Sequence, residues 1–179
     1  MTSRLICVIC GYSLRCYNLL MKINLLRISF AIILLTFAAP SQKSAQTKNF
    51  TSADLQKLRW IEGSWRGTGD NQPPFFERYR FEGDSVLVVD GFADEKLTKV
   101  TETTRFELKE GEFGGGNEGS VWVATTIDDN SIWFEPRVKA RNSFGWKRET
   151  KDSWTAILRW PANNDKPARE RSYHMERIR

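Results

Sequence analysis

Cysteine is missing from most of this sequence, and histidine is almost missing. Cys7, Cys10 and Cys16 all precede residue 20, so the later part of the chain can form neither a disulfide nor a thiolate metal site. The single histidine, His174, would have to serve any Cys-His or Ser-His-Asp hydrolase alone, and a zinc site would have to rely on carboxylates. We therefore expect no catalytic residues, no metal and no cofactor, and these observations favour a protein without enzymatic activity while leaving an enzyme open.

An excess of positive charge is also missing from most of the chain. The formal net charge is +5, with 27 basic and 22 acidic residues. Residues 1–45 contain five of the basic residues and no carboxylate, which leaves 22 residues of each sign in 46–179. A nucleic-acid surface needs a net basic stripe that follows the phosphates. We therefore expect no nucleic-acid partner.

The sequence contains no apolar run long enough to cross a membrane as a helix, which takes about 20 residues. Its longest run, 28–39, has 12 residues, follows two basic residues and precedes a small and polar stretch. This pattern is typical of a secretory signal peptide. We expect 1–20 to be a leader or an extension upstream of the true start, 21–45 to be the signal peptide, and the mature protein to be periplasmic or secreted. A membrane partner is expected only if the leader is retained as an anchor.

A short helix is predicted after the linker 46–51. The Thr51 hydroxyl can cap free backbone N–H groups, and Asp54 three residues later completes a capping box. Apolar residues then recur on one helix face, and Gly63 ends the helix. This helix should cover one end of the sheet that follows.

The rest of the chain, within the domain 52–179, reads as short strands separated by turn signals. Asp90-Gly91 is interpreted as a bulge inside a strand, and 109–119, with three consecutive glycines, as a loop. Consecutive strands without a crossover helix predict an all-β, antiparallel up-and-down barrel of about 8–10 strands. The expected strands are 65–68, 75–81, 85–92, 97–108, 120–127, 131–135, 143–149, 154–160 and 168–179.

Aromatic residues are abundant, and all seven tryptophans lie between residues 60 and 160. Bulky rings are typical of a packed core, but they also line small-molecule cavities. A barrel of eight strands is about wide enough for either. Our hypothesis is a cavity that binds a small hydrophobic or amphipathic molecule without covalent chemistry. Its predicted ligand-binding residues are Trp122, Trp133, Phe106, Tyr79, Phe81 and Trp146.

Four titratable residues are candidates for chemistry: Glu77, Asp90, Glu102 and His174. Glu77, Asp90 and Glu102 could supply paired carboxylates for acid–base work, but strand alternation is equally compatible with a solvated outer face for each. In the last strand, His174 has the opposite parity to Tyr173. If Tyr173 faces the core, His174 faces solvent.

The domain 52–179 resembles the lipocalin-like, or calycin, barrels of uncharacterised exported bacterial proteins. Gly63 and Trp65 match the Gly-x-Trp signature of that superfamily, preceded by a short helix. The resemblance implies that an arginine of the last strand stacks on Trp65, and Arg177 or Arg179 is the matching residue.

A more distant resemblance is to nitrobindin, the haem-binding barrel. Gly67 and Gly69 continue its glycine-rich signature, whereas Asn71 replaces the next glycine and the signature tyrosine is missing. This resemblance implies an alternative function, haem binding with His174 as axial ligand. A further alternative is a structural or interaction barrel that has no ligand inside and works through its surface or through the loop 111–119.

Overall fold

The computed structural model describes residues 49–117 and 119–179. The expected leader, 1–20, and signal peptide, 21–45, lie outside the described residues. Within the described part, the chain forms one short α-helix, one 3-10 turn and ten strands. These are α1 (Ser52–Gln56), η1 (Arg59–Ile61), β1 (Gly63–Gly69), β2 (Gln72–Glu82), β3 (Val86–Phe92), β4 (Val100–Lys109), β5 (Glu112–Gly116), β6 (Val121–Ile127), β7 (Ser131–Val138), β8 (Ser143–Arg148), β9 (Ser153–Trp160) and β10 (Arg169–Arg177).

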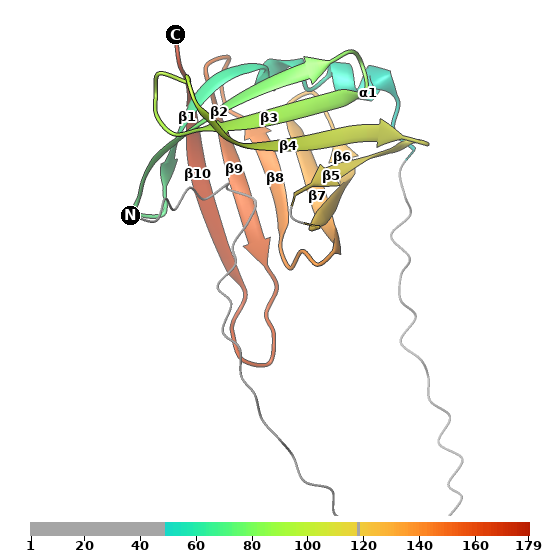
Figure 1. Ribbon diagram of the computed structural model, residues 1–179. Helices are drawn as coiled ribbons and strands as arrows, with labels where there is room; N and C mark the ends of the chain where they lie inside the picture. The colour runs from blue at the N-terminus through green and yellow to red at the C-terminus, as the bar shows by residue number, and fades with distance from the viewer. Residues whose placement is uncertain (1–48, 118) are drawn as a thin grey trace, which may run out of the picture. The chain divides into compact units, whose positions relative to one another are not determined.

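The ten strands form a closed antiparallel barrel, which confirms the predicted fold class (Figure 1). Each strand pairs with the next along the chain, and β10 returns to pair with β1, where Trp65 lies opposite Arg177. The register of β3 against β4 shifts between Gly91 and Phe92, so the predicted bulge lies inside a strand. Closure leaves no unpaired sheet edge in the barrel.

Strand β5 was not predicted, because its three consecutive glycines read as a loop. In the structure, Gly114 and Gly115 pair with residues of both β4 and β6, and Gly116 pairs with Arg105 of β4. A Cβ atom on Gly115 would lie 1.9 Å from the Arg105 carbonyl oxygen, and one on Gly114 would lie 2.6 Å from the Trp122 carbonyl oxygen. Only glycine permits this close approach of backbones. The loop proposed at 111–119 is therefore largely a strand.

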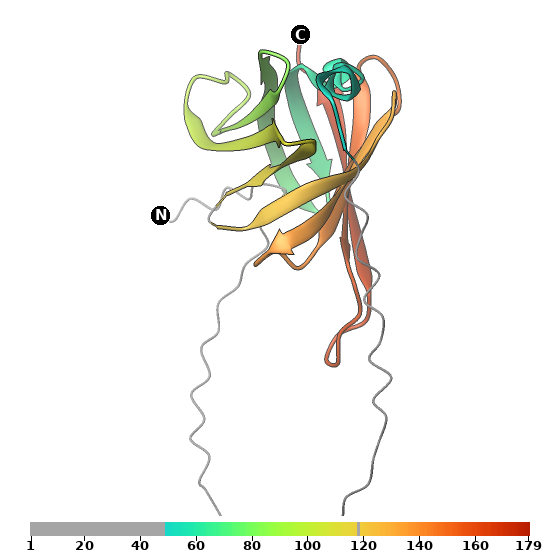
Figure 2. The same ribbon diagram turned by 90° about the vertical axis from the view of Figure 1, so that its right-hand side faces the viewer.

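Helix α1 covers one end of the barrel, as Figure 2 shows. The capping box forms as expected: the Thr51 side chain accepts from the Asp54 amide, and the Asp54 side chain accepts from the Thr51 amide. Leu55 of α1, and Leu58 and Ile61 at the two ends of the 3-10 turn, are buried in the core. The opposite end is marked by the hairpin of β9 and β10, which projects away from α1 in both views (Figures 1 and 2).

Aromatic rings fill much of the barrel interior. Phe134 and Phe144 stack with their centroids 4.6 Å apart. Tyr79 meets Trp146 edge-on at 5.5 Å, and Trp65 meets Trp154 in the same way at 5.9 Å. Edge-to-face and offset contacts are the favoured arrangements for such rings. The rings therefore contact one another and form the core.

Candidate functional site

The six predicted ligand-binding residues fall into three different environments. Phe106, Trp122, Tyr79 and Trp146 lie in the core, each at most 4% exposed. The Trp122 indole N–H donates to the Asn142 carbonyl at 2.8 Å, which satisfies its polar atom inside the protein. These four side chains are packed against other residues and belong to the core.

Two of the six lie elsewhere. Phe81 is half-buried near the helix end, where the Arg59 guanidinium lies 4.3 Å from its ring centroid. Trp133 was expected to line the interior of the barrel, but it lies on the outer face of β7. The Arg159 guanidinium lies 4.4 Å from its ring centroid. Its neighbour Ile132 points inward instead and is fully buried.

Arg177 is the arginine that stacks on the signature tryptophan. Its guanidinium carbon lies 4.1 Å from the Trp65 ring centroid, and its Nη1 donates to the Glu62 carbonyl at 2.8 Å. Gly63 has a φ of 128°, and a Cβ there would lie 2.2 Å from Arg177 Nη1. The glycine of the signature therefore makes room for the arginine. Arg179 instead pairs with Asp152 at 3.3 Å.

His174 lies on the outer face of β10 and does not fit the role of an axial haem ligand inside the barrel. Its Nδ1 is 3.2 Å from Glu149, and its Nε2 is 3.8 Å from Glu176. Its chain neighbours Tyr173 and Met175 face the core. Among the described residues, no group of three histidine, cysteine or carboxylate side chains could hold a metal ion.

The three candidate carboxylates divide between the two faces of the sheet. Asp90 lies on the outer face, where it accepts from Arg80 Nε at 3.2 Å and from the Thr103 hydroxyl at 2.7 Å. Glu77 and Glu102 share an inward-facing row, because both are in register with Gly91 between them.

Glu77 and Glu102 belong to a polar cluster inside the barrel. The Tyr79 hydroxyl donates to Glu77 at 2.7 Å, and the Asn117 amide donates to Glu102. Burial raises the pKa of Glu77 to about 7; the Tyr79 hydrogen bond opposes this increase, and the charge of Glu102 adds to it. Glu77 is therefore poised to exchange a proton near neutral pH.

A separate groove opens at the edge of the barrel, on the side where the β9–β10 hairpin projects. Strand β8 begins at Ser143, which pairs with Arg159. Trp160 therefore extends past the last residue of β9 that β8 covers, and Pro161 ends the strand because it lacks an N–H donor. The groove is the space beyond Ser143, where β8 no longer lies beside β9.

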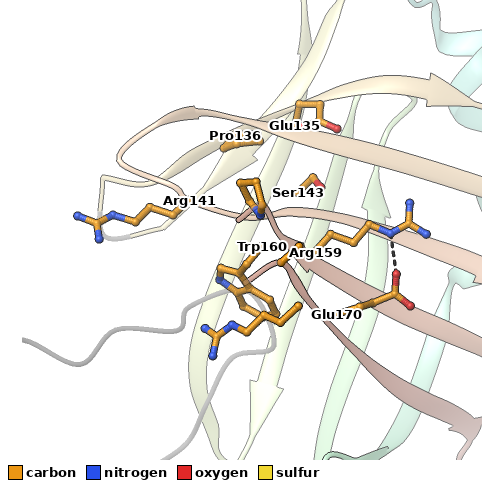
Figure 3. A pocket seen from close by; sticks show the side chains of 10 residues that line it. Glu135, Pro136, Arg141, Ser143, Arg159, Trp160 and Glu170 are labelled. Carbon is orange, nitrogen blue, oxygen red and sulfur yellow. Dashed lines mark hydrogen bonds and ion pairs between the residues drawn. The ribbon is translucent and has the colours of Figure 1, made fainter. Parts of the chain in front are cut away.

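This edge groove has a volume of about 510 Å³. It combines apolar walls with three arginines and two glutamates from β7, β8, β9, β10 and the adjoining loops (Figure 3). Its lining residues are Glu135, Pro136, Arg141, Ser143, Arg159, Trp160, Pro161, Ala168, Arg169 and Glu170.

The charges of the groove are arranged around Trp160. Arg169 stacks on its indole at 4.4 Å, and Arg159 pairs with Glu170 at 2.8 Å. Figure 3 shows Arg159 and Glu170 pointing toward one another, while Arg141 extends in a different direction. Burial raises the pKa of Glu135, and the charge of Arg159 acts in the opposite direction.

This groove was not predicted from the sequence. Alternation along β9 gives Trp160 the same parity as the buried Trp154 and Leu158, which predicts a core residue. One signal was available: Trp160 stands between an arginine and a proline at the end of its strand, and the facing strand begins with another arginine.

No protein-family model matches the sequence, and no curated protein matches it either. Two solved structures are similar to this chain. Rv2717c from M. tuberculosis is 17% identical, with a TM-score of 0.42, over 70% of this chain and 98% of that one. EF1p2_mFAP2b bound to DFHBI is 7% identical, with a TM-score of 0.36, over 68% of this chain and 97% of that one. Neither likeness carries a ligand or an activity over to this chain.

The closed antiparallel barrel fits a lipocalin-like fold in general. In the part of the chain that the structure describes, no helix is both long enough and apolar enough to traverse a bilayer.

Proposed function

We propose that this protein is a lipocalin-like binding module that takes a small amphipathic molecule into the edge groove without covalent chemistry. The observation that carries this proposal is the groove itself, with its volume of about 510 Å³. Small-molecule sites typically measure about 300–1,000 Å³ and combine apolar walls with a few polar groups.

The groove suits a ligand better than the ring-filled interior does. Phe106 and Phe134 are fully buried, their ring centroids lie 5.1 Å apart, and both contact further rings. A ligand there would have to displace packed side chains, which are as dense as an organic crystal. Trp160, by contrast, is half-buried at the rim and packs against the core from outside it.

Most of the affinity would come from apolar area removed from water against Trp160, Pro136, Pro161 and Ala168. Such burial contributes about 25 cal/mol per Å² before the cost of ordering the ligand. The arginines and glutamates at the rim would orient the polar part of the molecule.

The neutral probe N-phenyl-1-naphthylamine tests the proposal, because its fluorescence rises in an apolar site. We expect saturable binding to the wild-type protein. Trp160→Ala should weaken it at least about tenfold, because the indole supplies the largest apolar wall. Trp160→Phe, which keeps a ring, should lose less.

Phe81→Ala is the matched control. Phe81 is also a half-buried ring beneath a guanidinium, but it lies near the helix end. Its loss should leave probe binding unchanged, and near-ultraviolet circular dichroism checks that every variant is folded. Absence of probe binding, or equal binding by folded Trp160→Ala and wild type, would overturn the proposal.

Export to the periplasm or the medium is part of the same proposal. It rests on the apolar run 28–39 and the small, polar stretch after it. The intact mass of the protein recovered from outside the cytoplasm tests it, because removal of 1–45 would leave a product that begins near Gln46. Recovery of the full-length mass would contradict it.

A further inference from the structure

We infer that the ligand of the edge groove carries an oxyanion, a carboxylate or phosphate ester attached to an apolar chain or ring, and that Arg169 binds this oxyanion. The inference rests on the function proposed above and names the chemical class of its ligand. Trp160 has two roles in it: its indole forms the apolar wall, and it holds the arginine in place.

The Arg169 side chain is held against the Trp160 indole but is not paired with a carboxylate. Its guanidinium lies 4.4 Å from the Trp160 ring centroid. Within residues 49–117 and 119–179, its side chain has neither a hydrogen bond nor an ion pair. A guanidinium that stacks through its face keeps the N–H donors at its edge free, and this planar fork matches the two oxygens of a carboxylate or phosphate. Because the indole restricts its motion, binding an anion costs less conformational entropy.

The neighbouring Arg171 also lies near the Trp160 indole, but it has a carboxylate partner. Its guanidinium lies 5.7 Å from the Trp160 centroid, and its Nη1 pairs with Asp70 at 2.9 Å. Two arginines therefore flank one indole, and only Arg171 has a carboxylate partner in the described chain. Because Arg169 lines the groove, its unpaired N–H donors are available to a ligand there.

The balance of charge in the groove also favours an anion. Arg159 and Glu170 neutralise one another at 2.8 Å. This leaves Arg141 and Arg169 against Glu135, and Arg141 likewise has no ion pair or hydrogen bond with any described residue. A cationic ligand would find only one unpaired carboxylate, Glu135, whereas an anion finds two unpaired guanidiniums.

Four ligands that each contain a straight chain of ten carbon atoms test the inference: decanoate, decyl phosphate, decanol and decyltrimethylammonium, each below its micelle concentration. Displacement of N-phenyl-1-naphthylamine from the wild-type protein gives their affinities. We expect at least one of the two oxyanions to bind about tenfold or more tightly than decanol, and the cation to bind more weakly than decanol. The preference between decanoate and decyl phosphate identifies which head group the site takes.

The variants locate the effect. Arg169→Ala should weaken oxyanion binding about 10- to 100-fold and leave decanol unchanged, because charge-assisted hydrogen bonds are lost. Arg169→Lys keeps the charge but loses the planar fork, so it should retain only part of the affinity. Arg66→Ala is the matched control: it removes one outer-face arginine, paired with Glu176, far from the groove, and should change nothing.

A gain of binding separates the inference from loss of folding. Glu170→Gln leaves Arg159 without its partner and raises the positive charge of the groove. Oxyanion binding should become tighter, and binding of decyltrimethylammonium should weaken further. A misfolded variant would not show opposite changes for two ligands that both contain a ten-carbon chain.

The outcomes distinguish the two proposals. Equal affinity for oxyanions and decanol, with all binding lost in Trp160→Ala, overturns the oxyanion and leaves the groove as the ligand site. An oxyanion preference that survives in Arg169→Ala would show that Arg169 does not bind the oxyanion and would overturn that assignment. If none of the four ligands displaces the probe and folded Trp160→Ala binds the probe as wild type does, the proposed function itself is overturned.

Discussion

Trp65 and Trp133 both belong to predicted strands, yet they lie on opposite faces of the sheet. Trp65 could be placed from the sequence because a glycine two residues earlier and a C-terminal arginine mark it. Its N–H donates to the Ile61 carbonyl at 2.7 Å, inside the core. Trp133 could not be placed, because its neighbours Ile132 and Phe134 are apolar too, and a run of three apolar residues does not reveal which parity points inward.

The carboxylates show the same limit at the residue scale. Strand alternation left Glu77, Asp90 and Glu102 equally compatible with either face. Residues 77 and 102 became interior neighbours only through the register of β2, β3 and β4, which puts Gly91 between them. Register depends on pairing with strands that are distant in the sequence.

Glu77 predicts a pH dependence of stability. Burial raises its pKa from 4.5 to about 7 in the folded protein, so between these values the folded state keeps a proton that the unfolded state has lost. The free energy of unfolding should therefore fall as the pH rises through this window, by at most about 3 kcal/mol from this group, and level off above it. Glu77→Gln should remove this contribution, as measured by urea unfolding across the window.

Glu95→Gln is the control for that experiment, because Glu95 is exposed and its side chain pairs with no described residue. It should keep the wild-type dependence on pH. Identical pH profiles for wild type and Glu77→Gln would contradict the placement of Glu77 in the interior.

At the scale of elements, the helix and nine strands could be predicted, and β5 could not. The helix has a local cause, a capping box followed by apolar residues on one face, and the structure reproduces it. Glycine-rich β5 contradicts local propensity, since glycine weakens an isolated strand. It forms because β4 and β6 approach it on both sides, so tertiary contacts override the local preference.

Gly115→Ala tests why β5 contains glycine. The added Cβ would lie 1.9 Å from the Arg105 carbonyl oxygen, which belongs to backbone and cannot rotate away. We expect a loss of about 2 to 3 kcal/mol in the free energy of unfolding, measured with urea. Gly91→Ala in β3 is the control, because its Cβ would meet nothing closer than 3.6 Å. Similar stabilities of the two variants would show that β5 does not need this close approach.

At the scale of the whole described molecule, the seam between β1 and β10 makes the sheet continuous. The Ile178 amide donates to the Ser64 carbonyl at 2.9 Å, and Arg66 faces Glu176 across the seam. Arg177 strengthens the same seam from the side of the core, through the Trp60 and Glu62 carbonyls. The first and last strands therefore stabilise one another.

Hydrogen exchange tests this closure. Paired amides in β1 and β10 should exchange as slowly as those in β3 and β4, because a closed sheet has no frayed edge and opens only by global unfolding. Mass spectrometry of peptides from 63–69 and 169–177, compared with 100–109, gives the measurement. Exchange of the seam peptides many-fold faster than 100–109 would indicate an open sheet.

The sequence by itself determined the class of the fold and the position of the helix, and its resemblance to lipocalin-like barrels implied that Arg177 or Arg179 stacks on the signature tryptophan. These depend on local patterns, namely a capping box, alternating strands, turn residues and a short motif. Only the tertiary structure decided which parity of each strand faces inward, and that Trp160 rather than the core rings lines a groove. The groove exists because β8 begins one residue short of the end of β9, and its arginines and indole come from β9, β10 and the loop that precedes β8. No local pattern encodes such a meeting of strand ends, because it depends on how far each strand extends past its neighbours.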